Sequence, residues 1–205
     1  MGPCCTKRQK HKELMGIIEE DQDPVSQRGN WIQVGKKIYN AMFQMVTGGK
    51  AGVCRVEEFP HPPGSRVLSD FAILVRAMII RQTTKASSMP PNNLVIYKSK
   101  GHFEYGFIKG IYNFSDNHQK MLTGIYVQKI HNVYPKLQYP PGHIGYYLQL
   151  LGVTIGTIEQ DEFQMISPSK IVSLAAYRLF DNEVFRVSNH GVILCPSNRQ
   201  LSGFF

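Results

Sequence analysis

The stretch between residues 94 and 158 constrains the fold most, because β-branched and aromatic residues dominate it and Gly, Asn, Asp and Pro interrupt it repeatedly. Short apolar runs bounded by turn-forming residues are typical of antiparallel strands. Four runs stand out, at 94–97, 103–114, 122–133 and 145–158. They predict one antiparallel sheet of four or five strands.

Two main helices are predicted beside this sheet. The first covers 65–81, where Ser65 is a candidate cap and apolar residues recur at helical spacing: Val67, Leu68, Phe71, Leu74, Val75, Met78 and Ile79. The second covers 168–180, with Ser167 as N-cap and Pro168 at the first helical position. Strands and helices in this proportion indicate a single α+β domain over 30–205, with the helices packed on the sheet.

Shorter elements complete the expected order. A helix within 31–46 is closed by Gly48 and Gly49, and a strand at 51–59 is ended by Pro60. A final hairpin pairs 184–187 with 192–195 through a turn at 189–191.

Residues 1–29 form a predicted flexible tail that is first basic and then acidic. Gly2 and Thr6 match the N-myristoylation pattern, and Cys4 and Cys5 are candidates for thioester-linked acyl chains. Pro3 directly after the acceptor glycine is unfavourable to that pattern, so acylation of Gly2 and acylation of the cysteines remain alternatives, as does an unmodified basic leader. Four cations follow: Lys7, Arg8, Lys10 and Lys12. Because one acyl chain gives only reversible binding and a polybasic patch reinforces it, we expect attachment to the cytoplasmic face of a membrane.

Composition limits the classes of function. Hydrophobic residues make up 42% and charged residues 19% of the chain, which is typical of a globular domain. The net charge of +8 indicates an acidic partner, such as lipid headgroups, nucleic acid or an acidic protein.

No residue pattern predicts an enzyme or a cofactor. Cys54 with His61, and Cys195 with His190, lack an accompanying glycine-rich oxyanion loop, so a thiol nucleophile at either place is only an alternative. Four further histidines, His102, His118, His131 and His143, lack the spacing of a metal site. Glu159, Asp161 and Glu162 fall in a predicted solvated turn.

Aromatic and basic residues alternate in 97–103 and 105–109. Stacking rings beside cations are typical of single-strand nucleic-acid binding, although strand alternation in a basic protein gives the same pattern. A basic nucleic-acid-binding module is therefore one alternative function.

The peptide Tyr134-Pro135-Lys136-Leu137 resembles the Y-P-x-L late-domain motif, with which enveloped viruses recruit host membrane-scission machinery. Tyr134, Pro135 and Leu137 are its matching positions. Prolines at 140 and 141 favour an exposed, extended loop here, and an ordinary turn at the end of a strand remains the alternative.

Taken together, the basic tail, the charge, the late-domain-like peptide and the predicted element order resemble the matrix proteins of negative-strand RNA viruses, the rhabdovirus matrix proteins in particular. In element order the similarity covers 51–59, 65–81, 94–158, 168–180 and 184–195. The resemblance implies a peripheral structural protein of the virion that self-associates beneath a membrane. It also implies bridging to a ribonucleoprotein or nucleoprotein, and support of assembly and budding at the host cell membrane.

A cellular lipid-anchored cytosolic adaptor is a further alternative. Such a protein would carry the same tail and bind a specific protein partner, without self-assembly.

Overall fold

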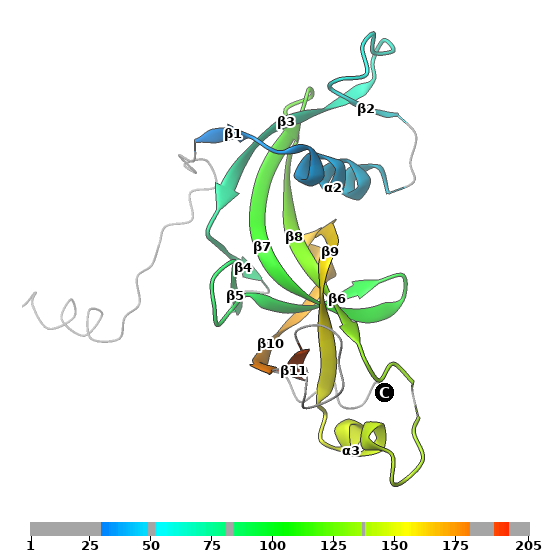
Figure 1. Ribbon diagram of the computed structural model, residues 1–205. Coiled ribbons are helices and arrows are strands. Elements are labelled where there is room, and N and C mark those ends of the chain that lie inside the picture. Colours follow the sequence, from blue (N-terminus) through cyan, green and yellow to red (C-terminus); the bar gives the residue numbers. More distant parts are fainter. Residues whose placement is uncertain (1–29, 49–51, 81–83, 137, 181–190, 197–205) are drawn as a thin grey trace, which may run out of the picture.

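The computed structural model describes residues 30–48, 52–80, 84–136, 138–180 and 191–196 (Figure 1). The strands are β1 (Trp31–Gln33), β2 (Val53–Arg55), β3 (Arg66–Val75), β4 (Ala77–Ile80), β5 (Thr84–Ser87), β6 (Leu94–Ser99), β7 (His102–Asp116), β8 (Met121–Asn132), β9 (Thr154–Ile166), β10 (Ile171–Phe180) and β11 (Gly191–Pro196). The helices are α2 (Lys36–Thr47) and α3 (Ile144–Leu150), with a 3₁₀ turn, η1 (Pro168–Lys170). Among these described residues no helix has the length and hydropathy of a membrane span.

Six strands form a closed ring in the order β7, β6, β10, β11, β9, β8 and back to β7. Every neighbouring pair in the ring is antiparallel. β7 has 15 residues and pairs with β8 along one edge. Along its other edge it pairs with β6 in its first half and with β3 in its second half. β3 in turn carries β1 antiparallel and β2 parallel on its outer edge, so the sheet extends beyond the ring at the end shown at the top of Figure 1.

A cluster of buried side chains fills the inside of the ring. Five of the ring strands contribute its buried members, and β9 contributes the half-buried Ile158. Its buried members are Leu94, Ile96, Tyr105, Phe107, Ile130, Ala175, Val192 and Leu194. Because successive side chains of a strand point to opposite faces, Val95 and Tyr97 of β6 lie on the outer face instead.

The outer faces of the ring strands are also covered. The β4–β5 hairpin packs on β6, β7 and β8 through Ile80 and Ala86. Farther along the β7–β8 hairpin, α2 packs on β3, β7, β8 and β9 through a face that includes Ala41 and the fully buried Met42. The helix ends at Gly48, whose φ of +46° is a left-handed conformation that glycine adopts readily.

The predicted fold class is wrong: the structure has a nine-stranded sheet, and the two main predicted helices are strands. Region 65–81 forms β3 and β4. Its apolar residues are divided between the two faces of the strand, since Leu68 and Ala72 face α2 whereas Val75 packs with the β4–β5 side. Because both faces of the strand carry apolar residues, apolar and polar residues do not alternate along it. The spacing of its apolar residues then resembles that of an amphipathic helix.

Region 168–180 is η1 followed by β10. Ser167 does act as a cap, because its hydroxyl accepts a hydrogen bond from the Ser169 N–H, but the capped segment is a single 3₁₀ turn. A bulge between Ile171 and Ser173 then shifts the register of β10. The bulge places Ile171 and Leu174, three residues apart, on one face, which produces the helix-like spacing.

The remaining expectations had mixed outcomes. The helix within 31–46 is confirmed as α2, whereas the strand at 51–59 is reduced to β2. The run at 145–158 contains α3 before the start of β9, and Glu159, Asp161 and Glu162 lie within β9, not in a turn. β11 pairs with β10 and β9, while 184–187 lie outside the described residues.

Candidate functional site

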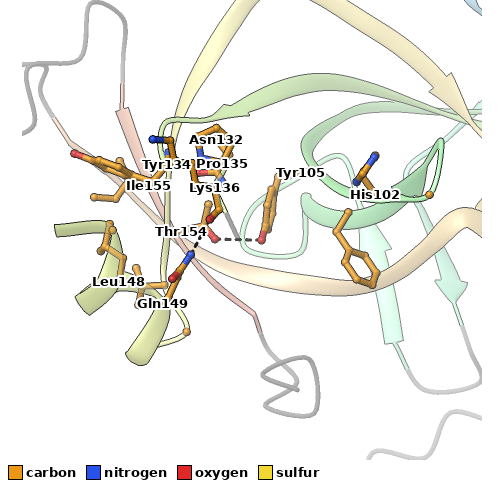
Figure 2. A pocket seen from close by; sticks show the side chains of 15 residues that line it. His102, Tyr105, Asn132, Tyr134, Pro135, Lys136, Leu148, Gln149, Thr154 and Ile155 are labelled. Atoms are coloured by element: carbon orange, nitrogen blue, oxygen red, sulfur yellow. Dashed lines mark hydrogen bonds between the residues drawn. The ribbon is translucent and has the colours of Figure 1, made fainter. Parts of the chain in front are cut away.

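A cavity of about 390 Å³ lies at one end of the strand ring, between α3 and the strand ends beside it (Figure 2). Cavities of this size, at the ends of closed strand arrangements, are common places for small ligands. Four parts of the chain line it: Gly101, His102, Phe103 and Tyr105 from the β6–β7 turn and β7; Asn132, Tyr134, Pro135 and Lys136 from the end of β8; Gly145, Leu148 and Gln149 from α3; and Gly152, Val153, Thr154 and Ile155 before and within β9.

Local contacts hold α3 over this end of the ring. The Nδ1 atom of His143 accepts a hydrogen bond from the Gly145 N–H at 3.0 Å and so caps the helix. The ring of Tyr139 stacks on the His143 ring, with 4.6 Å between centroids, and lies so close to Gly145 that a Cβ there would be 2.6 Å from a ring carbon. Glycine is therefore required at this position.

A further contact ties α3 to the chain that follows β8. The Gln149 side chain donates to the carbonyl oxygen of Lys136 at 2.8 Å (Figure 2). This bond closes the wall between the helix and residues 132–136.

The inner wall of the cavity carries neutral polar groups. The hydroxyls of Tyr105 and Thr154 are hydrogen-bonded at 3.1 Å (Figure 2). Burial raises the pKa of Tyr105 and the hydrogen bond with Thr154 opposes that rise only in part, so the phenol keeps its proton at neutral pH. The Oδ1 atom of Asn132 accepts from the Tyr134 N–H at 2.9 Å, which fixes the Asn132 side chain at the rim.

The described lining contains no carboxylate. Apart from its tyrosines, the ionisable side chains are His102 and Lys136, both exposed. An anionic or neutral ligand therefore fits this chemistry, whereas a metal cation or an ammonium group would have no counter-charge there.

The opposite face of α3 is apolar and open to solvent. Gly145, Leu148 and Gln149 line the cavity, whereas Ile144, Tyr147, Leu150 and the following Leu151 are 41%, 52%, 68% and 74% exposed. Their spacing of i, i+3, i+6 and i+7 follows one side of a helix. We call these four residues the α3 stripe; it lies at the end of the molecule opposite β1 (Figure 1).

The sequence around the α3 stripe is free of acidic residues. Between residues 117 and 158 there is no Asp or Glu, while the segment contains Lys120, Lys129, Lys136, His118, His131 and His143. Lys129 has an acidic partner from a later part of the chain, with its Nζ 3.8 Å from Glu162. Of these lysines only Lys136 is placed at α3, through the hydrogen bond between its carbonyl oxygen and Gln149, whereas Lys120 lies at the β7–β8 turn beside Arg66 and α2.

The predicted lipidation and membrane-binding residues, Gly2, Cys4, Cys5, Lys7, Arg8, Lys10 and Lys12, all lie outside the described residues. Of the late-domain-like peptide, Tyr134 is half-buried and edge-on to Tyr139 and His143, with ring centroids 6.1 and 5.9 Å away. Pro135 is exposed and Leu137 lies outside the described residues. The tyrosine is thus part of the aromatic support of α3, while Pro135 and Lys136 of the expected loop are exposed and lie outside helices and strands.

The structure gives the candidate thiol sites different surroundings. Cys54 is half-buried on β2, and the His61 Nε2 atom lies 2.8 Å from the Arg55 carbonyl oxygen. Cys195 is exposed on β11, and His190 lies outside the described residues. No cluster of three or more His, Cys, Asp or Glu side chains suited to a metal occurs among the described residues.

The aromatic residues of 97–109 are mostly unavailable for stacking on bases. Tyr97 is fully buried, and its hydroxyl donates to Glu104 at 3.0 Å. Tyr105 and Phe107 are buried inside the ring. These three aromatic side chains are thus buried in the protein, and the exposed side chains of this region include the lysines Lys98 and Lys109.

Comparison with known proteins returned no match to any family model, curated protein or solved structure.

Proposed function

We propose that this protein is a peripheral membrane-associated structural protein of the viral matrix type. One observation carries the proposal: the α3 stripe exposes four apolar side chains beside Lys136, in a part of the sequence that has no carboxylates. An exposed apolar helix face beside positive charge suits the surface of an anionic bilayer.

The physical argument combines two weak attractions. An interfacial helix buries its apolar face about 5–10 Å into the headgroup region, and each nearby lysine contributes about 1 kcal/mol at an anionic surface. The predicted acyl and polybasic tail would add a second attachment to the same protein. Two linked attachments bind far more tightly than either alone when both reach the membrane.

The matrix role adds self-assembly under the membrane, bridging to a ribonucleoprotein and support of budding. The element order that suggested this family is not found, because 65–81 and 168–180 are strands. Support for the role comes instead from the α3 stripe, the predicted tail and the net charge of +8.

The test uses the full chain in eukaryotic cells fed alkyne-tagged myristate or palmitate, followed by membrane fractionation. We expect label on the parent protein and reduced membrane recovery for G2A or for C4S/C5S. The same protein on vesicles of phosphatidylcholine and phosphatidylserine should form cross-linkable oligomers. An unlabelled chain that stays off both membranes would refute membrane attachment, and a membrane-bound chain that stays monomeric at saturation would favour an adaptor.

A further inference from the structure

We propose that the cavity behind α3 binds the headgroup of an anionic glycerophospholipid whose phosphate carries a hydroxylated substituent, of the phosphatidylinositol kind. The proposal rests on the proposed membrane function, because it assigns a lipid to the site that the membrane contact brings to the bilayer. Three features carry it: the charge of the lining, its mixed polarity, and its place relative to the α3 stripe.

The charged groups of the lining favour a phosphate. Lys136 and His102 belong to the lining and are exposed, with the Lys136 Nζ 6.0 Å from the centroid of the Tyr139 ring, and the described lining residues include no Asp or Glu. Headgroups that carry an ammonium, such as choline, would place a cation near Lys136 without a carboxylate to pair with it. The aromatic rings of Phe103, Tyr105 and Tyr134 could attract such a cation, so the choline lipid is a necessary comparison in the test.

The uncharged part of the lining favours hydroxyl groups joined to an apolar body. Asn132, Thr154 and the protonated Tyr105 hydroxyl offer hydrogen bonds to hydroxyls and phosphate oxygens. Leu148 and Val153 supply apolar wall on the α3 side. A ligand that uses both kinds of wall has a polar head and a glycerol or acyl portion, which distinguishes a lipid from a free phosphate ester.

The place of the cavity matches the depth of lipid headgroups. One face of α3 forms its wall and the other face is the α3 stripe, so the thickness of one helix, about 10 Å, separates the two. If the stripe enters the bilayer by about 5–10 Å, the cavity lies at the level of the phosphates. A headgroup could then enter without leaving the membrane.

The test titrates unacylated full-length protein calorimetrically with dihexanoylphosphatidylinositol below its micellar concentration. We expect saturable binding of one lipid per chain. Dihexanoylphosphatidylcholine, glycerophosphoinositol without acyl chains, and a short oligouridylate should each bind at least tenfold more weakly. Equal binding of the choline lipid, of the acyl-free ester or of the oligonucleotide would overturn the proposal in favour of a cation cage, a soluble phosphate ester or RNA.

Two variants place the binding in the cavity. L148W fills it with a larger side chain, and K136Q removes the cationic group from an exposed position where folding is unaffected. Each should weaken the soluble lipid at least threefold, whereas K109Q, an exposed lysine of β7 outside the lining, should leave it unchanged. Lipid binding that survives both cavity variants would contradict the assignment.

A second comparison separates this proposal from the proposed function. L150Q/L151Q should lose binding to vesicles and keep the soluble lipid, because the α3 stripe faces away from the cavity. L148W should still sediment with vesicles. Vesicle binding by the parent without any soluble-lipid binding would overturn the headgroup site and leave the membrane function standing.

Discussion

Replacing both leucines at the C-terminal end of the α3 stripe should weaken membrane binding strongly. The double variant L150Q/L151Q puts two neutral polar side chains where the structure exposes apolar ones, at 68% and 74% of their surface. Folding should be nearly unaffected, since substitutions of exposed residues outside special backbone positions usually change stability by less than about 0.5 kcal/mol.

The expected size follows from the exposed fractions. Full burial of a leucine side chain contributes about 1.5–3 kcal/mol, so transfer of the exposed parts of Leu150 and Leu151 into lipid is worth about 2–4 kcal/mol together. That range corresponds to a decrease of roughly 30- to 1,000-fold in the partition coefficient. The Lys136 charge contributes only about 1 kcal/mol, so the apolar term dominates at physiological salt.

The assay is cosedimentation of the unacylated full chain with vesicles of phosphatidylcholine and phosphatidylserine over a lipid titration. The matched control is L74Q/I79Q, which replaces two aliphatic side chains that are each 52% exposed on β3 and β4, away from α3. The control should bind like the parent. Equal loss in both double variants, or no loss in L150Q/L151Q, would refute the assignment of the membrane contact to α3.

Three further predictions concern the fold. The Arg66 guanidinium donates to the Asp116 carboxylate, whose side chain is 1% exposed. Burial acts to raise the pKa of Asp116. The hydrogen bonds from Arg66 and from two backbone N–H groups outweigh this effect, so the pKa is lowered. The ionised carboxylate therefore stabilises the fold at pH values above its ordinary pKa of 3.8, and this stabilisation is lost as the pH falls through the lowered native pKa. The variant D116N should lose about 2–3 kcal/mol of unfolding free energy at neutral pH. In chemical denaturation, its stability should also depend less on pH in the acid range than that of the parent. G156A should destabilise by about 1–3 kcal/mol in the same assay, because its Cβ would lie 2.3 Å from a methyl carbon of Ile130. M42A should cost about 2–5 kcal/mol by leaving a cavity under α2, measured as a lower urea midpoint.

Strands were predictable from sequence where β-branched and aromatic residues form long runs. The runs at 94–97, 103–114 and 122–133 coincide with β6, β7 and β8, because β-branched and aromatic residues there are bounded by turns. The predictions of helices at β3 and β10 were wrong for a physical reason. Apolar residues on two faces of β3, and a bulge in β10, create spacings of apolar residues that a helix would also produce. Local periodicity cannot separate these cases, since the second face is covered by distant elements.

At α3 the error was the reverse, because a strand was predicted and the structure has a helix. Its Ile144, Tyr146 and Tyr147 favour a strand by propensity, yet His143 caps a helix there and Gly145 allows Tyr139 to pack against it. The i, i+3, i+6 and i+7 spacing of the α3 stripe is a signal that could have identified the helix. The absence of carboxylates from 117–158 was equally visible in the sequence.

The cavity itself was not predictable. Its lining comes from the start of β7, the end of β8, α3 and the start of β9, which meet only because the ring closes. In the sequence, Tyr134 and Lys136 belong to a late-domain-like peptide. In the structure, Tyr134 packs against Tyr139, and both residues line this cavity.

The most direct test of the membrane contact at α3 is fluorescence quenching by brominated lipids. The chain has one tryptophan, Trp31, which lies on β1 at the end opposite α3 (Figure 1). The variant W31F/Y147W moves the fluorophore to the α3 stripe, where vesicles of brominated phosphatidylcholine and phosphatidylserine should shift its emission to the blue and quench it. The parent, bound to the same vesicles, should keep the emission of Trp31. Quenching of Trp31 in the parent without quenching in W31F/Y147W would contradict the claim that α3 is the part of the folded domain that meets the membrane.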